Sequence, residues 1–385
     1  MANTIVNVGK FADKVQANLR VGTPAIGIST TRYEAALSVG QTFNAPYMNS
    51  VRVQDYTYST NATVDDTTLT ADSLTINQVK IATANYDPLQ NLLTSQWEDE
   101  LAADMGYQMG RNINQFASQT GVNGADTTVA GGTLNAGNVY EFLTSISSGI
   151  SRKRAGSGAM FGLVEPGFLD YLVLADLANG FKRADAGLRQ GYVGDTNAGF
   201  RIYECHDLPC TVSLTMDTQP TNLDTTTVYG SVWTWVTDGT AATAGEINIG
   251  ANIADAQAIF VTAINGTTPP AANDYIDLST DERREYQNGQ VAAATFATNV
   301  CVLTAYGRIG AAETFTAATN VFGDETCSQL FGHVGALDLV VQSAPQIEER
   351  LPVANKSVNV LGTMQYGSHV YNRMAKKLAT GTFTV

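Results

Sequence analysis

A long amphipathic helix is the clearest element that the pattern of apolar and polar positions predicts. Apolar residues recur at four-residue steps at Leu89, Leu93, Trp97, Leu101, Met105, Met109 and Ile113, with Leu92 and Phe116 beside them. Asp87 can cap the helix and Pro88 is tolerated at the first helical position, so we expect the helix to begin there. A length of about 30 residues gives a rod of about 45 Å. An ordinary long core helix shows the same pattern, so the helix alone does not specify a fold.

Two alternating segments precede this helix. Val51–Gln54 and Leu74–Asn77 alternate apolar and polar residues, which predicts two strands. The chain between them, Ser59 to Asp72, is rich in Thr, Asn and Asp, as is typical of an exposed hairpin tip. A two-stranded excursion is only marginally stable by itself, so it needs another surface to lie on, and a second subunit can supply one.

The residues before the hairpin predict an extended arm. A short helix from Val6 to Leu19 is interrupted by Gly22, Pro24 and Gly27. This segment holds too little apolar surface to fold alone, so we expect it to lie across a neighbour.

Helices and strands alternate after the long helix. Thr120 to Gly137 is rich in Gly and Thr and predicts a linker. Apolar residues at helical spacing then predict a helix at Val139, Phe142, Leu143, Ile146 and Ile150. Met160–Val164 predicts a buried strand, Pro166 opens a second helix, and Gly191–Gly194 and Gly199–Tyr203 predict short strands. Such alternation is typical of a compact α+β domain.

The composition changes between about residues 225 and 322. Thr, Ala and Gly dominate there, and the basic residues are Arg283, Arg284 and Arg308. Strands are predicted at 232–236 and 247–249, and a helix at 253–264. This segment is therefore interpreted as an inserted domain. After it, residues 337–341 and 357–371 return to the character of the chain before it.

The charge and the cysteines exclude some classes of protein. The 385 residues carry a formal net charge of −14, which argues against a dedicated nucleic-acid binder but suits a wall that encloses DNA without adhering to it. Cys205, Cys210, Cys301 and Cys327 lack the spacing of a zinc site, so we expect four reduced cysteines. No signal peptide and no apolar run of about 20 residues is visible, so no membrane partner is expected.

The candidate chemistry is sparse. His206, His333 and His369 each stand apart from a recognisable catalytic arrangement. An acidic cluster, Asp274, Asp277, Asp281 and Glu282, could hold calcium, but it lacks the Asp-x-Asp-x-Asp-Gly pattern and fits a solvated surface better. We therefore expect no enzyme activity, no catalytic residue, no cofactor and no metal.

Several short motifs, taken in order, resemble the major capsid protein of tailed bacteriophages, whose shell fold is named for coliphage Hong Kong ninety-seven. They are Val53-Gln54-Asp55-Tyr56-Thr57, Asp65-Asp66 before Leu74-Thr75-Ile76-Asn77-Gln78, Asp87-Pro88, Val164-Glu165-Pro166, Gly191-Tyr192-Val193-Gly194, Gly199-Phe200-Arg201-Ile202-Tyr203-Glu204 and Gln365-Tyr366-Gly367-Ser368-His369-Val370. The resemblance covers most of residues 30–215 and 325–385.

The resemblance implies an α+β phage capsid fold with six parts. These are an N-terminal arm (1–50), an extended loop (51–84), a peripheral domain with a long spine helix (85–136), an axial domain (137–224), an inserted β-rich domain (225–322), and a return to the axial and peripheral domains (323–385). Inter-subunit contacts of the extended loop would involve Tyr56, Asp65, Asp66, Leu69 and Leu74. Some members crosslink a loop lysine, but Lys80 lies at the base of this loop, so no crosslink is expected.

The function implied is that of a capsid subunit that self-assembles into the icosahedral head around double-stranded DNA. Its partners would be its own copies in hexamers and pentamers, a separate scaffolding protein, a portal, DNA without sequence-specific contact, and in some cases a decoration protein. It would be assembled in the host cytoplasm and located in the virion. The alternative is another phage structural protein, such as a tail-tube or surface-adhesion subunit.

Overall fold

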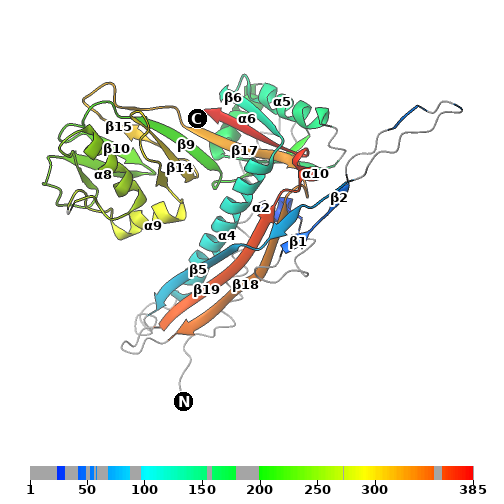
Figure 1. Ribbon diagram of the computed structural model, residues 1–385, viewed down its shortest axis with the longest axis horizontal. Helices are drawn as coiled ribbons and strands as arrows, with labels where there is room; N and C mark the ends of the chain where they lie inside the picture. Colours follow the sequence, from blue (N-terminus) through cyan, green and yellow to red (C-terminus); the bar gives the residue numbers. More distant parts are fainter. Residues whose placement is uncertain are drawn as a thin grey trace, which may run out of the picture.

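A computed structural model describes residues 24–30, 42–48, 53–55, 58, 68–86, 97–153, 158–178, 199–271, 273–350 and 358–384. Figure 1 shows three groups of elements: a long sheet with a helix beside it, a group around α5 and α6, and a group around α8 and α9. Strands β9 and β17 run between the last two groups and join them.

A nine-stranded sheet within the described residues forms this connection. Its main path is β13-β14-β9-β17-β20-β6, and β16, β7 and β8 pair beside that path. The strands are β6 (Thr127–Thr133), β7 (Met160–Val164), β8 (Phe200–Glu204), β9 (Pro209–Thr215), β13 (Ala292–Ala293), β14 (Val300–Tyr306), β16 (Val321–Phe322), β17 (Thr326–His333) and β20 (Leu378–Thr384). The predicted strands at 160–164 and 199–203 are confirmed as β7 and β8, whereas 191–194 lies outside the described residues.

Helices α5 (Val139–Arg152) and α6 (Pro166–Ala178) pack on one face of this sheet. The five apolar residues that predicted α5 are all buried, and Pro166 is the first residue of α6, as predicted. Phe142, Phe168 and Phe331 meet edge-on or tilted, with ring centroids 5.9 to 6.4 Å apart. Aromatic burial therefore fixes the two helices on the sheet.

The long helix α4 (Trp97–Gly124) lies along a second sheet of β18 (Asp338–Arg350), β19 (Val358–His369) and β5 (Gln78–Tyr86) (Figure 1). Its buried stripe includes Met105, Met109 and Ile113, which were predicted. The predicted start at Asp87–Pro88 lies outside the described residues.

The predicted linker at 120–137 is wrong, because α4 runs on to Gly124 and β6 follows at Thr127. Two glycines explain the difference. A side chain at Gly121 would meet Leu330 at 2.4 Å, and one at Gly124 would meet Val370 at 2.6 Å. These glycines therefore lie within the helix, where they allow other parts of the chain to pack closely against it. The Gly- and Thr-rich pattern had instead suggested a linker here.

The strands before α4 also differ from the prediction. Strand β1 (Thr42–Asn44) pairs with β4 (Ser73–Thr75), and β2 (Tyr47–Met48) pairs with β3 (Leu69–Thr70). The strand predicted at 51–54 is wrong in its described part, because Val53 and Gln54 lie outside any strand. The pairing occurs a few residues earlier, where each residue finds an opposite partner. The strand predicted at 74–77 is confirmed in part by β4.

The third group has a core of its own. Strands β10 (Thr225–Val228), β11 (Ser231–Val236), β12 (Glu246–Asn248) and β15 (Ala312–Glu313) form a sheet beside α8 (Ile253–Asn265) and α9 (Thr280–Asn288). Trp233 and Trp235 are fully buried, and their indole N–H groups donate to Tyr286 Oη at 3.0 Å and Thr226 Oγ1 at 2.8 Å. The predicted strand at 232–236 and the helix at 253–264 are confirmed, and the strand at 247–249 is confirmed in part by β12.

This core extends beyond residues 225–322, because Val212 and Leu214 of β9 belong to it. Two short helices, α2 (Pro24–Ile28) and α10 (Asn372–Ala375), complete the described elements. Among the helices described, no segment combines the length and the apolar character that a membrane crossing requires.

Candidate assembly surfaces

The hairpin predicted before α4 has a firmly held root. We call residues 45–72 the extension; its two ends meet where Ala45 N donates to Asp72 O at 2.7 Å. The Asp72 carboxylate lies 2.7 Å from His369 Nε2 and accepts a hydrogen bond of 2.6 Å from the backbone of Asn372. Asp72 is 8% exposed, so these charge-assisted contacts are shielded from water.

Apolar packing supports the same root. Leu74 and Ile76 are buried against Val340 and Tyr371, with Phe43 alongside. The root therefore belongs to the body of this chain, and the strands β2 and β3 lead away from it (Figure 1).

Beyond the root, the described residues of the extension expose apolar side chains. Met48 is 56% exposed, Leu69 70%, Tyr58 89% and Val53 97%. Isolated exposed apolar residues are common, but four on one projection form an apolar surface that a neighbouring copy could cover.

The predicted contact residues fall in different places. Leu69 is exposed on the extension, whereas Leu74 is fully buried in the root and presents no surface to a neighbour in this conformation. Tyr56, Asp65 and Asp66 lie outside the described residues. The sequence analysis did not single out Met48 and Tyr58. The missed signal was the presence of large apolar residues in an otherwise polar segment.

A polar network attaches the third group to α4. Arg111 of α4 donates from Nε to Asp207 Oδ1 at 2.8 Å and from Nη2 to Tyr229 Oη at 2.6 Å. Gln115, one turn further, donates to Asn288 O at 2.7 Å and accepts from Gln290 Nε2 at 2.8 Å. These contacts join α4 to residues near 229 and 288–290.

Burial governs the charges in this network. It raises the pKa of Asp207 above its ordinary value, and the guanidinium of Arg111 offsets only part of that rise. Burial opposes the charge on Arg111, yet Tyr229 and Asp207 keep its pKa above the ordinary value. Both groups are about one-tenth exposed, so each depends on the other for its hydrogen bonds.

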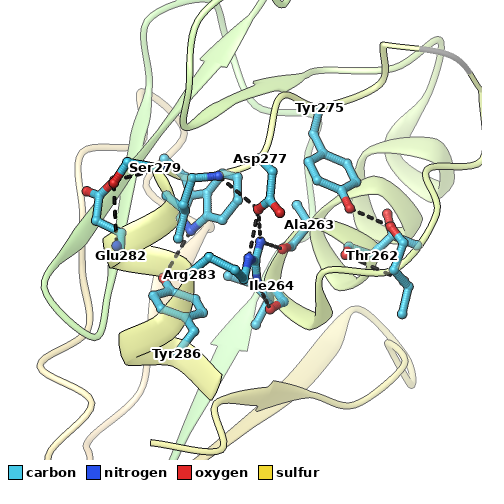
Figure 2. Close-up of polar contacts among 12 residues, drawn as sticks. Thr262, Ala263, Ile264, Tyr275, Asp277, Ser279, Glu282, Arg283 and Tyr286 are labelled. Atoms are coloured by element: carbon cyan, nitrogen blue, oxygen red, sulfur yellow. Dashed lines mark hydrogen bonds and ion pairs between the residues drawn. The ribbon is translucent and has the colours of Figure 1, made fainter. Parts of the chain in front are cut away.

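The acidic cluster around residue 277 holds the third group together (Figure 2). Asp277 pairs with Arg283, whose Nη atoms also donate to Ile264 O at 2.9 Å and Ala263 O at 2.7 Å, at the end of α8. Glu282 forms a capping box with Ser279 at the start of α9. Asp274 accepts from Ala271 N, and Asp281 pairs with Arg284. The carboxylates therefore serve caps and ion pairs and do not converge on one point.

The three histidines lie in three separate settings. His206 is exposed and lies 3.1 Å from Glu204, and His369 binds Asp72 at the extension root. His333 is buried beside Gly158, and this burial lowers its pKa. Burial also raises the pKa of the Cys205 thiol to about 12, so this thiol stays protonated at neutral pH.

The expectation of four reduced cysteines is wrong. Cys210 of β9 and Cys327 of β17 are joined by a disulfide, while Cys205 and Cys301 are free and buried. The two bonded residues are opposite each other on adjacent strands but 117 residues apart in sequence, so spacing could not identify them. Glu325 lies beside them, but its carboxylate accepts from Ile309 N and Gly310 N.

Comparison with solved structures identifies the fold. A structure from Mycobacterium phage Che8 aligns with 93% of this chain and 90% of its own, at 13% identity and a TM-score of 0.53. The chain shares its fold with this phage structure. No family model and no curated protein matches the chain, so the likeness is one of structure.

Two other matches are described as capsids. The acidic stable capsid structure of Helicobacter pylori bacteriophage KHP30 aligns with 95% of this chain and 91% of its own, at 8% identity and a TM-score of 0.48. The asymmetric unit of bacteriophage PhiM1 mature capsid aligns with 94% and 87%, at 13% identity and 0.47. Both scores are below 0.5, so the fold assignment depends on the first comparison alone.

Proposed function

We propose that this chain is a major capsid protein, many copies of which close into the icosahedral head of a tailed phage around double-stranded DNA. The fold shared with the Che8 phage structure supports this, and the extension is the observation that carries it. A projection rooted by Asp72 and Leu74, yet exposing Met48, Leu69 and Tyr58, gains its stability from a neighbouring copy.

The charge of the chain suits a shell that holds DNA without binding its sequence. A net charge of −14 repels the phosphate backbone, so the packaged polymer stays mobile. The subunit acts by matching surfaces and not by catalysis, since the buried cysteine and the scattered histidines offer no activated group. Copies would meet in hexamers and pentamers, where repetition over a closed lattice adds many modest contacts.

The proposal extends to the parts and partners of the subunit. The segment 225–322 would be an inserted domain attached through Arg111 and Gln115 to the spine helix α4, with 51–84 as the extended loop. A scaffolding protein and a portal would guide assembly in the host cytoplasm, and a decoration protein is a further possible partner. In the extended loop, Tyr56, Asp65, Asp66 and Leu69 would contact the neighbouring copy, while Leu74 would fix the base.

A shortened extension tests the proposal. Met48 pairs directly with Leu69, so residues 49–68 are replaced by an Asn-Gly turn, which closes a two-residue hairpin between them. We expect a folded subunit that no longer forms shells, observed by negative-stain microscopy and sedimentation. Shells of normal size from this variant would contradict the role of the extension.

A point substitution gives a matched control. Leu69→Asp charges an exposed residue of the extension, whereas Leu223→Asp charges a residue of equal exposure, 70% against 71%, in the third group. Leu223 has a positive φ of 74°, which aspartate tolerates, so the control is not strained. We expect Leu69→Asp to abolish shells and Leu223→Asp to preserve them. Rods in place of shells from the unaltered chain would favour a tail-tube subunit.

A further inference from the structure

One face of the nine-stranded sheet carries a patch of small, branched, uncharged side chains. A register row crosses the sheet from β13 to β6, through Ala292, Thr304, Thr211, Thr326, Thr384 and Thr133. Each of these residues is directly opposite the next on a neighbouring strand. On β9 and β14, Thr211 and Thr304 are exposed, which identifies this side of the sheet as the open one.

Two further rows continue the patch away from α4. Val302 is opposite Ser213, and Val300 is opposite Thr215, which in turn is opposite Val321 of β16. Val300 is 36% exposed, and Val302 and Val321 are each 43% exposed. We call these three rows the valine–threonine face. All of its side chains are uncharged, in a chain that carries 36 acidic and 22 basic residues.

The opposite face of the same strands is packed in a core. Cys301, Leu303, Val212 and Leu214 alternate with the exposed residues and are buried in the core of the third group. The strands therefore have one packed face and one open face, as in a sheet that awaits a second layer.

The side chains of the open face are suited to a dry contact. Valine and threonine are stiff at χ1, so burying them costs little rotamer entropy. Their strands are about 4.8 Å apart, so the face covers roughly 300 Å². That area is well below the approximately 800 Å² per partner of a stable interface. The contact therefore holds only as one of many in a closed assembly.

We propose that the valine–threonine face packs against the same face of a second copy of this chain. Two copies with a net charge of −14 repel each other, so they meet at lowest cost where both surfaces are uncharged. Two identical faces can pack sheet on sheet about a two-fold axis, so the contact needs no second kind of surface. This inference rests on the proposed function, because the contact is too small to hold two free subunits.

Charge complementation across the two-fold contact tests the inference. Val302→Lys and Val302→Glu each place charges of one sign on both copies within the same small contact. The yield of shells from each variant alone should therefore fall at least about tenfold. An equal mixture of the two variants should recover part of the shells, because the contacts between unlike copies then hold opposite charges within the same face. Val232→Lys is the control: Val232 is 51% exposed on β11, outside the face, and this variant should assemble normally.

The outcomes separate this inference from the proposed function. If the unaltered chain forms no shells, with or without a scaffolding protein, the proposed function fails and the two-fold contact with it. If it forms shells and Val302→Lys does too, only the two-fold contact is refuted. If each variant fails and the mixture also fails, the face meets a different surface or a decoration protein, and the inference is overturned.

Folding of each variant is checked by circular dichroism of the unassembled subunit. If a substitution at Val302 unfolds the subunit, Thr304→Lys and Thr304→Glu repeat the test at an exposed position in the neighbouring row. Recovery by mixing is a result that a purely structural role of either residue would not give.

Discussion

Gly367 lies where the root of the extension meets β19. A Cβ atom at this position would lie 2.5 Å from Thr75 O and 3.0 Å from the Cα of Ile76. Both are backbone atoms, which cannot swing away as the end of a side chain can. Close approach of two backbones is therefore the reason for glycine here.

Gly367→Ala should separate β19 from the chain after β4 and lower the free energy of unfolding by about 1–3 kcal/mol, the usual cost of overpacking. Urea denaturation of the subunit measures this change. Gly27→Ala is the control, because a Cβ there would meet nothing within 4 Å. Equal stabilities of the two variants would show that the strands separate without cost.

Arg111 and Asp207 depend on each other in the contact between α4 and the third group. Arg111→Met leaves the Asp207 carboxylate buried without its cation, which should cost about 3–5 kcal/mol at pH 7. The double variant Arg111→Met/Asp207→Asn should recover much of that loss, because no buried charge is then left unpaired; Glu285, which lies 3.7 Å from Arg111 Nη1, is exposed to water. Urea midpoints of the single and double variants provide the comparison.

This loss should depend on pH. The folded-state pKa of Asp207 is already raised by burial, and removing Arg111 raises it further. The folded state then binds a proton that the unfolded state has released, so stability falls as pH rises from the unfolded to the folded pKa. Arg111→Met should therefore be less damaging at pH 5 than at pH 7. A penalty that is equal at both pH values would contradict the assignment to Asp207.

At the scale of elements, the disulfide joins the strand that leads into the third group to the strand that leads out of it. Cys210 is 1% exposed and Cys327 is fully buried, so a reductant reaches the bond only when the strands part. The loop that it closes is long, and long loops lose the most chain entropy on closure.

Cys210→Ala/Cys327→Ala should lower the free energy of unfolding by about 2–5 kcal/mol relative to the oxidised chain. Dithiothreitol present during urea unfolding should destabilise the unaltered chain to a similar extent and leave the variant unchanged. Thiol titration under denaturing conditions should find two free thiols before reduction and four after it. Four free thiols in the freshly purified, air-exposed protein would show that the bond does not form.

At the scale of the whole molecule, net charge opposes assembly. Copies of charge −14 repel one another, and salt screens that repulsion over a Debye length of about 10 Å at 0.1 M. Raising NaCl from about 0.05 M to about 0.5 M should therefore increase the fraction of protein in shells. Sedimentation measures that fraction. Dissociation by salt would instead indicate that ion pairs hold the copies together.

The sequence predicted those elements in which one local pattern coincides with one structural unit. Helix α5 could be predicted because all five of its periodic apolar residues are buried. Helix α6 could be predicted because Pro166 is its first residue. The end of α4 could not be predicted, since Gly121 and Gly124 allow close packing against residues that are distant in sequence. The sequence analysis predicted no strand at β18, whose alternation is disrupted by register shifts after Val341 and Ser343.

The assembly surfaces were harder to predict than the elements. The hairpin motif led to the extension, but which of its residues are exposed depends on the root formed with His369 and Val340, far along the chain. The pairing of Arg111 with Asp207 and the disulfide join residues separated by 96 and 117 positions, respectively. A single sequence carries no local signal for contacts of this range.

The adjacency of β9 and β17 also makes the third group replaceable. The Cα atoms of Cys210 and Cys327 are only 4.1 Å apart, so the chain leaves and rejoins the rest of the subunit at almost the same point. Of the described residues between Cys210 and Cys327, none belongs to the cores around α4 or around α5 and α6. A foreign domain whose own termini are adjacent could therefore be grafted at this junction without disturbing those two cores. Because the graft would remove most of the valine–threonine face, we expect a folded subunit that forms few shells.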